Sequence, residues 1–167
     1  GRWNTLVTAL QQFKDDYDKN QPLWRILPEF INKHPVYERM GLKDLCDKLH
    51  GLYKQYDVAR LTTEMYLSDM VPAMRPADAW AKMAHRQIER VPVDELEGRI
   101  TASLVTPYPP GIPLLIPGER FNKTVVDYLK FVREFNKQLP GFETDVHGLV
   151  AEEVDGQRVY HIDCVKD

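Results

Sequence analysis

The stretch Thr106-Pro-Tyr-Pro-Pro-Gly-Ile-Pro-Leu-Leu-Ile-Pro-Gly-Glu119, here called the proline corner, is the most constrained part of the chain. Each proline fixes its own φ angle, lacks a backbone donor and pushes the preceding residue towards extended conformations, which excludes helix. We expect the Tyr108–Pro109 bond to be trans, as most X-Pro bonds are. The corner contains five of the chain's 12 prolines: Pro107, Pro109, Pro110, Pro113 and Pro117.

The segments around these prolines predict short extended pieces. The apolar run 100–105 predicts a strand that leads into the corner, and Leu114, Leu115 and Ile116 predict a short buried strand inside it. Pro117-Gly118 predicts a sharp turn. Because the prolines already restrict the unfolded chain, ordering this corner costs little entropy. We therefore expect a rigid element that can hold a side chain or a partner backbone in place.

Helical spacing of apolar residues dominates the N-terminal half. It predicts helices over 3–18, 23–32, 42–56, 57–67, 77–88 and, after the corner, 125–135. Val91 and Val93 indicate a short strand, and 142–154 and 158–165 indicate two more, joined by a turn at Asp155-Gly156. The predicted class is α+β, with N-terminal helices followed by a small mixed sheet, the proline corner and a C-terminal hairpin.

Composition limits the classes of function. The 167 residues are 43% hydrophobic and 28% charged, which is typical of one globular domain, and the net charge of −3 gives no basic surface for nucleic acid. No apolar run approaches the roughly 20 residues that span a bilayer, and no signal-peptide pattern opens the sequence. Cys46 and Cys164 form no disulfide motif, so we expect a reduced, cytoplasmic protein.

Several motifs carry a family resemblance. The segment GRITASLVTPYPPGIPLLIPGE at 98–119, with LPEF, LKDLCDKLH and PGFETDVHG in the same order, resembles the C-terminal domain of bacterial ornithine/lysine/arginine decarboxylases. These are pyridoxal 5′-phosphate-dependent enzymes of fold type I. The resemblance implies that residues 1–21 form a helix closing the preceding domain of a parent enzyme. Residues 22–167 would then be the C-terminal domain.

The resemblance also implies a reaction and partners. Such an enzyme removes the α-carboxylate of a basic amino acid, here arginine or lysine rather than ornithine, and works as a homodimer or higher homo-oligomer. Its cofactor is held by a lysine in a Ser-x-His-Lys context, which this sequence lacks, and no Gly-rich phosphate loop or nucleophile elbow occurs. We therefore expect no catalytic, cofactor-binding or metal-binding residue in this chain, and no activity without the remainder of the polypeptide.

Three polar residues lie beside rigid backbone: Tyr108, Glu119 and Arg99. Tyr108 could pack on the corner and Glu119 could favour the positive end of the following helix; alternatively, the three line the active-site entrance implied by the resemblance. Residues 141–167 could form a negative rim that attracts a cationic substrate, or a solvated surface. That segment has a net charge of −5, from Arg158 and Lys166 against Glu143, Asp145, Glu152, Glu153, Asp155, Asp163 and Asp167.

Two further pairs have simpler interpretations. Cys46 and His50 have the i, i+4 spacing of metal ligands, but Cys46 is on an apolar stripe and favours core packing. His147 and His161 could face each other across the C-terminal hairpin, although structural histidines are the simpler interpretation. A different class of function also fits the composition: a free-standing interaction module that uses a sheet edge and the acidic segment to dock a partner protein.

Overall fold

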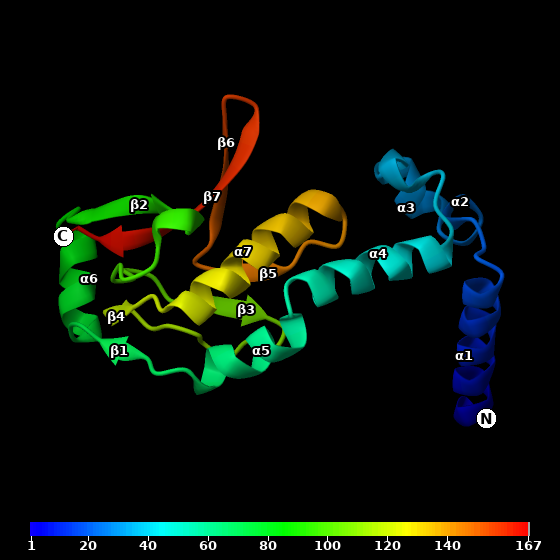
Figure 1. The fold of residues 1–167 in the computed structure, drawn as a ribbon, viewed down its shortest axis with the longest axis horizontal. Coiled ribbons are helices and arrows are strands. Elements are labelled where there is room, and N and C mark those ends of the chain that lie inside the picture. The colour runs from blue at the N-terminus through cyan, green and yellow to red at the C-terminus, as the bar shows by residue number, and fades with distance from the viewer. Residues whose placement is uncertain (167) are drawn as a thin grey trace. The chain divides into compact units, whose positions relative to one another are not determined.

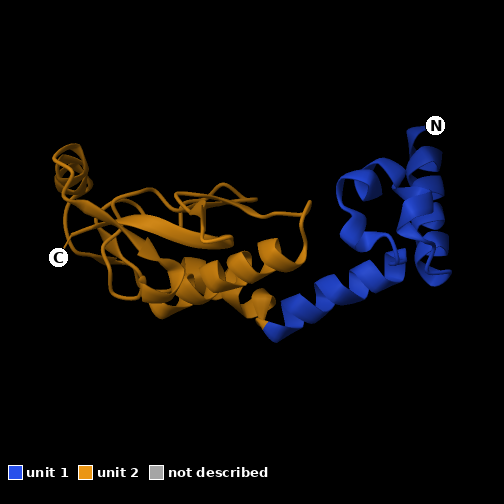
Figure 2. Cartoon of the chain, turned by 90° about the horizontal axis from the view of Figure 1, so that it is seen from above, with its two compact units in different colours: residues 1–55 blue, residues 56–167 orange. Residues whose placement is uncertain are grey.

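The computed structural model describes residues 1–166 and confirms the α+β class. The chain divides into two compact units, residues 1–55 (unit 1) and residues 56–167 (unit 2), as Figure 2 shows. The boundary that the family resemblance implies, between residues 21 and 22 of this chain, stays a prediction.

Unit 1 is helical. Its elements are α1 (Arg2–Asp18), α2 (Leu23–Ile26), α3 (Pro28–Lys33), a 3-10 turn (Pro35–Tyr37) and α4 (Leu42–Gln55). The single helix expected over 23–32 is two helices, because Pro28 keeps Leu27 out of the helical region (φ −135°, ψ 54°). No residue of α1 is buried within the described chain, whereas Leu23 and Tyr37 are fully buried.

A side chain distant in sequence caps α4. Asn20 Oδ1 accepts hydrogen bonds from the backbone N–H groups of Lys43 (3.0 Å) and Asp44 (3.2 Å). Asp44 Oδ2 in turn accepts from Gly41 N at 2.9 Å, and this bond, followed by that from Asn20, lowers the pKa of Asp44. The first N–H groups of a helix lack internal partners, so these contacts fix where α4 begins.

The described residues of unit 2 form three α-helices, a 3-10 turn and three small antiparallel sheets. Figure 1 shows their arrangement. The helices are α5 (Val58–Leu67), α6 (Pro76–Ala84) and α7 (Lys123–Gln138). They match the predicted helical segments, except that α6 ends at Ala84 rather than at residue 88, and Ile88 begins β2. Most of one face of α7 is buried, including Val125, Leu129 and Val132, so this helix forms the centre of the core of unit 2.

The strands pair as β1 with β4, β3 with β5, and β2 with β7 and β6, so the strands form three sheets rather than one. A two-residue turn joins β6 and β7, in which Asp155 (φ 50°) and Gly156 (φ 75°) both adopt positive φ, as predicted. The bounds are β1 (Val71–Pro72), β2 (Ile88–Pro92), β3 (Thr106–Tyr108), β4 (Glu119–Arg120), β5 (Asp145–His147), β6 (Val150–Val154) and β7 (Gln157–Val165).

The strand predicted over 142–154 is interrupted at Gly148. This glycine has φ 91°, and a Cβ here would overlap the carbonyl oxygen of Leu104. The chain turns at this point, so β5 and β6 join different sheets.

The proline corner and the segment that leads into it differ from expectation in three respects. Residues 100–105 form only isolated bridges, because Thr101 Oγ1 bonds locally with the backbone of Ser103 and the ladder is interrupted there. The Tyr108–Pro109 bond is cis, so the trans prediction was wrong; the chain reverses tightly here, and Gly111 N donates to Pro107 O at 2.8 Å. Leu114 and Leu115 are buried as predicted, but Ile116, next to the Pro117-Gly118 turn, is 41% exposed.

Candidate functional site

Arg99 and Glu119 lie on two segments that pair directly. Phe121 N donates to Arg99 O and Thr101 N donates to Glu119 O, each at 2.9 Å, around the bridge between Ile100 and Arg120. The pairing places Arg99 and Glu119 near one another in the ladder, but their side chains have different partners.

Glu119 stabilises its own turn. Its Oε2 accepts a hydrogen bond from Ile116 N at 2.9 Å, and its backbone N donates to Ile116 O at 3.2 Å across Pro117-Gly118. The cap of α7 is Asn122, whose Oδ1 accepts from Val125 N at 2.9 Å. The Glu119 side chain therefore stabilises the corner. The N-terminal end of α7, which Glu119 could have favoured, is capped by Asn122 instead.

Arg99 is mostly enclosed, with 21% of its side chain exposed. Its guanidinium forms an ion pair with Glu89 of β2 and lies 3.4 Å from the carbonyl oxygen of Val165 at the end of β7. These contacts tie the 98–101 segment to the three-stranded sheet, which is a structural role for the positive charge.

Tyr108 is on a different strand pair. It pairs with Asp145 in the β3–β5 sheet and is 52% exposed, whereas Arg99 and Glu119 lie on the segments around the Ile100–Arg120 bridge. Its ring packs beside Gly111, where an added Cβ would lie 3.1 Å from Cε1. Ile112 and Ile116, which are 54% and 41% exposed, are two further exposed apolar side chains of the corner.

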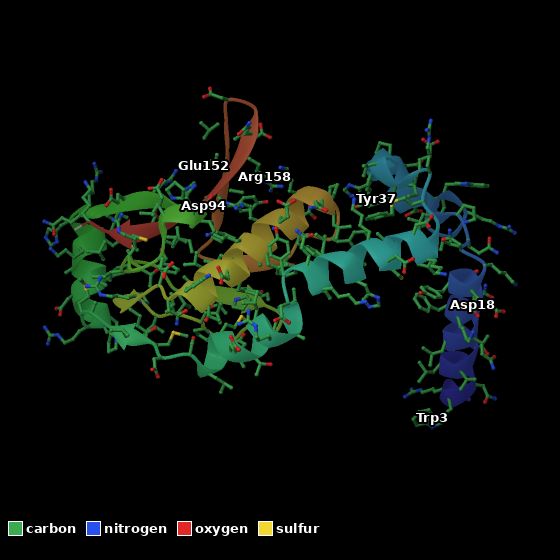
Figure 3. All side chains as sticks on the ribbon, viewed as in Figure 1. Trp3, Asp18, Tyr37, Asp94, Glu152 and Arg158 are labelled. Carbon is green, nitrogen blue, oxygen red and sulfur yellow. The ribbon has the colours of Figure 1, made fainter. Side chains whose placement is uncertain are left out.

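The acidic C-terminal segment is partly neutralised. Arg90 of β2 forms an ion pair with Glu152 of β6, and its Nε lies 3.7 Å from Asp163 of β7. Figure 3 shows Glu152 on the hairpin. Asp167 lies outside the described residues. A negative rim built from this segment would therefore depend on the remaining acids, such as Glu153 and Asp155, which are exposed.

The paired histidines and the cysteine take structural positions. His147 pairs with Thr106, and His161 pairs with Val150, so the alternative in which the two histidines face each other does not hold. His161 is 4% exposed, and its Nε2 lies 3.8 Å from Glu152 Oε1.

Burial raises the pKa of Cys46, which disfavours the thiolate needed to bind a metal. Within 1–166 no group of three or more His, Cys, Asp or Glu side chains is arranged to hold a metal ion.

One polar groove was not anticipated from the sequence. It has a volume of about 710 Å³ and lies between the C-terminal part of α7 and the start of β7. Arg133 and Lys137 are four residues apart on α7, a helical signal visible in the sequence, whereas the approach of Arg158 and Tyr160 from the hairpin depends on tertiary structure.

Across residues 1–166, no helix has both the length and the apolar character that crossing a membrane requires.

Comparisons with known proteins give one family. The family described as "Orn/Lys/Arg decarboxylase, C-terminal domain" matches residues 59–166. Lysine decarboxylase LdcA of Pseudomonas aeruginosa is 43% identical over 171 residues, covering 100% of this chain and 23% of the relative. The biodegradative arginine decarboxylase of Escherichia coli is 38% identical, covering 99% of this chain and 22% of the relative.

Solved structures give the same result. The structure of lysine decarboxylase A from Pseudomonas aeruginosa superposes with a TM-score of 0.90 at 44% identity, covering 99% of this chain and 23% of that one. The chain thus spans less than a quarter of the length of the relatives that it matches.

Proposed function

The chain belongs to the family of Orn/Lys/Arg decarboxylase C-terminal domains, and from this membership we propose that it serves an enzyme that decarboxylates a basic amino acid. The observation that carries the proposal is the match over residues 59–166, which coincides with unit 2, a compact body with its own core. Relatives named lysine and arginine decarboxylases make these two amino acids the first substrates to test, before ornithine.

The cofactor of the proposed enzyme is pyridoxal 5′-phosphate, which supplies the electron sink for loss of the α-carboxylate. Holding it requires an enclosed lysine, donors for the phosphate and an acid near the pyridine nitrogen. The residues of this chain do not fit that requirement, because every lysine in 1–166 is at least partly exposed. We therefore derive no chemical step from these residues and assign cofactor binding to the remainder of the parent polypeptide.

We propose two supporting roles for this chain. Unit 2 would flank the active-site entrance through the proline corner, where Tyr108 and Ile112 present an apolar surface and Glu119 and Arg99 hold the adjacent backbone. Residues 1–21, which include α1, would pack against the preceding domain. Trp3 at the start of α1 (Figure 3) and Leu10 are 79% and 61% exposed, which is costly for large apolar side chains unless another surface covers them.

The proposed enzyme is a cytoplasmic homodimer or higher homo-oligomer. A stand-alone interaction module is the alternative class of function, and the exposed apolar residues of α1 are compatible with it. The two proposals differ in whether activity on an amino acid requires this chain.

The test is release of carbon dioxide from L-lysine, L-arginine and L-ornithine by the protein encoded by the complete reading frame. We expect activity on lysine or arginine. Deletion of residues 56–167 should cause a large loss of this activity, and the truncated protein should assemble poorly. An inactive complete protein, or a deletion that leaves activity unchanged, would refute the proposal.

A further inference from the structure

The polar groove of unit 2 is enclosed by three segments that are separate in sequence. One wall comes from α7 and the 3-10 turn Val93–Glu95, the other from the turn and first residues of β7, and the 140–143 loop closes one end. Figure 3 shows Asp94 and Arg158 on these elements. Its lining is Asp94, Arg133, Glu134, Asn136, Lys137, Pro140, Glu143, Gly156, Gln157, Arg158 and Tyr160.

The acidic side chains of the groove already have partners. Asp94 accepts from Arg133 at 2.7 Å and lies 3.8 Å from Lys130. Glu134 accepts from the Gln138 side chain, and Glu143 Oε2 accepts from Gly141 N at 3.0 Å. These contacts occupy carboxylate oxygens, so the acids have less capacity to bind a cation from solution.

Two cations of the groove have no acidic partner. Neither Lys137 nor Arg158 forms an ion pair with any residue in 1–166, although they approach the groove from opposite walls. The Arg158 guanidinium lies 5.7 Å above the Tyr160 ring, a cation–π contact that positions it beside the groove while leaving its N–H donors available.

Tyr160 supports the wall of the groove. The residue is 6% exposed and its hydroxyl is buried, so the hydroxyl does not reach a ligand in the groove. What the residue supplies is the ring face that holds the Arg158 guanidinium.

We propose that this groove binds a small organic or inorganic anion carrying carboxylate or phosphate oxygens. Arg158 suits such a ligand because its planar donors match two oxygens at once, and Lys137 supplies a second positive charge across the groove. The site lies outside the proline corner, and the proposal goes beyond the decarboxylase function: it adds a ligand site in the domain itself.

The experiment titrates the 15N-labelled 167-residue chain with inorganic phosphate and, separately, with succinate, at constant ionic strength maintained with sodium chloride. We expect saturable shifts of the Gly156 and Gln157 amide signals with at least one probe. Arg158→Gln and Lys137→Gln should each weaken binding about tenfold, as expected for loss of one charge-assisted hydrogen bond. Lys82→Gln, which changes an exposed lysine of α6 outside the groove, should leave binding unchanged.

The two probes separate the sources of the anion. Saturation by phosphate alone assigns a phosphate ligand, saturation by succinate alone assigns a carboxylate, and saturation by both supports a site that recognises charge. In each variant, the amide signals of residues outside the groove should match those of the parent, which shows that the variant is folded. Linear shifts with both probes into the millimolar range, or equal weakening by Lys82→Gln, would overturn the proposal.

Discussion

The side-chain amide of Asn122 connects two helices, because its Nδ2 donates to Ser68 Oγ at 3.0 Å while its Oδ1 caps α7 through Val125 N. One residue therefore fixes both the start of α7 and its position relative to the end of α5, within the core of unit 2.

Asn122→Ala removes both contacts. We expect a loss of about 2 kcal/mol in the free energy of unfolding, from about 1 kcal/mol each for the cap and the hydrogen bond to Ser68. Asn122→Asp keeps the acceptor for Val125 N and should lose only about half as much. Urea unfolding of the two variants measures the difference, and equal losses would show that the cap contributes nothing.

Gly111→Val tests the rigidity of the proline corner. Gly111 has φ 81°, and a Cβ here would press on the Tyr108 ring, so a β-branched residue is strained in this backbone conformation. Displacing Leu114 and Leu115 from the core would cost roughly 1.5–3 kcal/mol for each side chain, against a typical total stability of about 5–15 kcal/mol. We therefore expect a large fall in melting temperature.

The matched control is Ile112→Val, which changes an exposed neighbour and should leave the melting temperature almost unaltered. A Gly111→Val chain that melts within a degree or two of the parent would mean that the corner does not organise unit 2.

Asp94→Asn tests the ion pairs beside the groove. The hydrogen bond from Arg133, followed by the charges of Arg133 and Lys130, lowers the pKa of Asp94 against an opposing effect of burial. A lowered folded-state pKa contributes stability above the unfolded pKa of about 3.9, and that contribution is lost as pH falls through the folded value.

Because Asp94 is 59% exposed, solvent screens the pair, and we expect a loss of at most about 1 kcal/mol at pH 7. The difference between parent and Asp94→Asn should shrink below about pH 4 and vanish below the folded pKa. Asp69→Asn, at an exposed aspartate that forms no ion pair in 1–166, is the control. A difference that stays constant with pH would show that the aspartate acts through packing instead.

Replacing both Leu6 and Leu10 by Gln tests the role of α1. These side chains are 50% and 61% exposed, so the melting temperature of the chain should change little, whereas self-association seen by sedimentation should fall. Leu45→Gln, at a residue 4% exposed in α4, should destabilise unit 1 strongly. A large loss from the α1 double variant would show that α1 belongs to the core of this chain.

Local patterns predicted much of the fold. The apolar spacing of α7, its end before Pro140-Gly141 and the Asp155-Gly156 turn depend on neighbouring residues, so the sequence was sufficient for them. The interruption of the strand predicted over 100–105 depends on the Thr101 hydroxyl. The break at Gly148 depends on the close approach of Leu104, and no periodicity in the sequence encodes that contact.

The candidate site was harder to predict from the sequence, because it too depends on contacts between residues that are distant in the chain. Arg99, Glu119 and Tyr108 were selected for their positions beside rigid backbone, but strand register decides which of them share a ladder. The groove depends on the approach of Arg158 to Lys137, which is 21 positions earlier in the chain, and helical spacing alone cannot predict that approach.

The central claim is that this chain supports a decarboxylase whose cofactor is held elsewhere in the parent. Its most direct test is to incubate the 167-residue chain with pyridoxal 5′-phosphate, reduce with borohydride and locate pyridoxyl-lysine by peptide mass spectrometry. The complete protein, treated alongside, should label at one lysine outside this chain, while the chain alone should show only sparse modification spread over its exposed lysines. Stoichiometric labelling of a single lysine within residues 1–167 of the isolated chain would contradict the account.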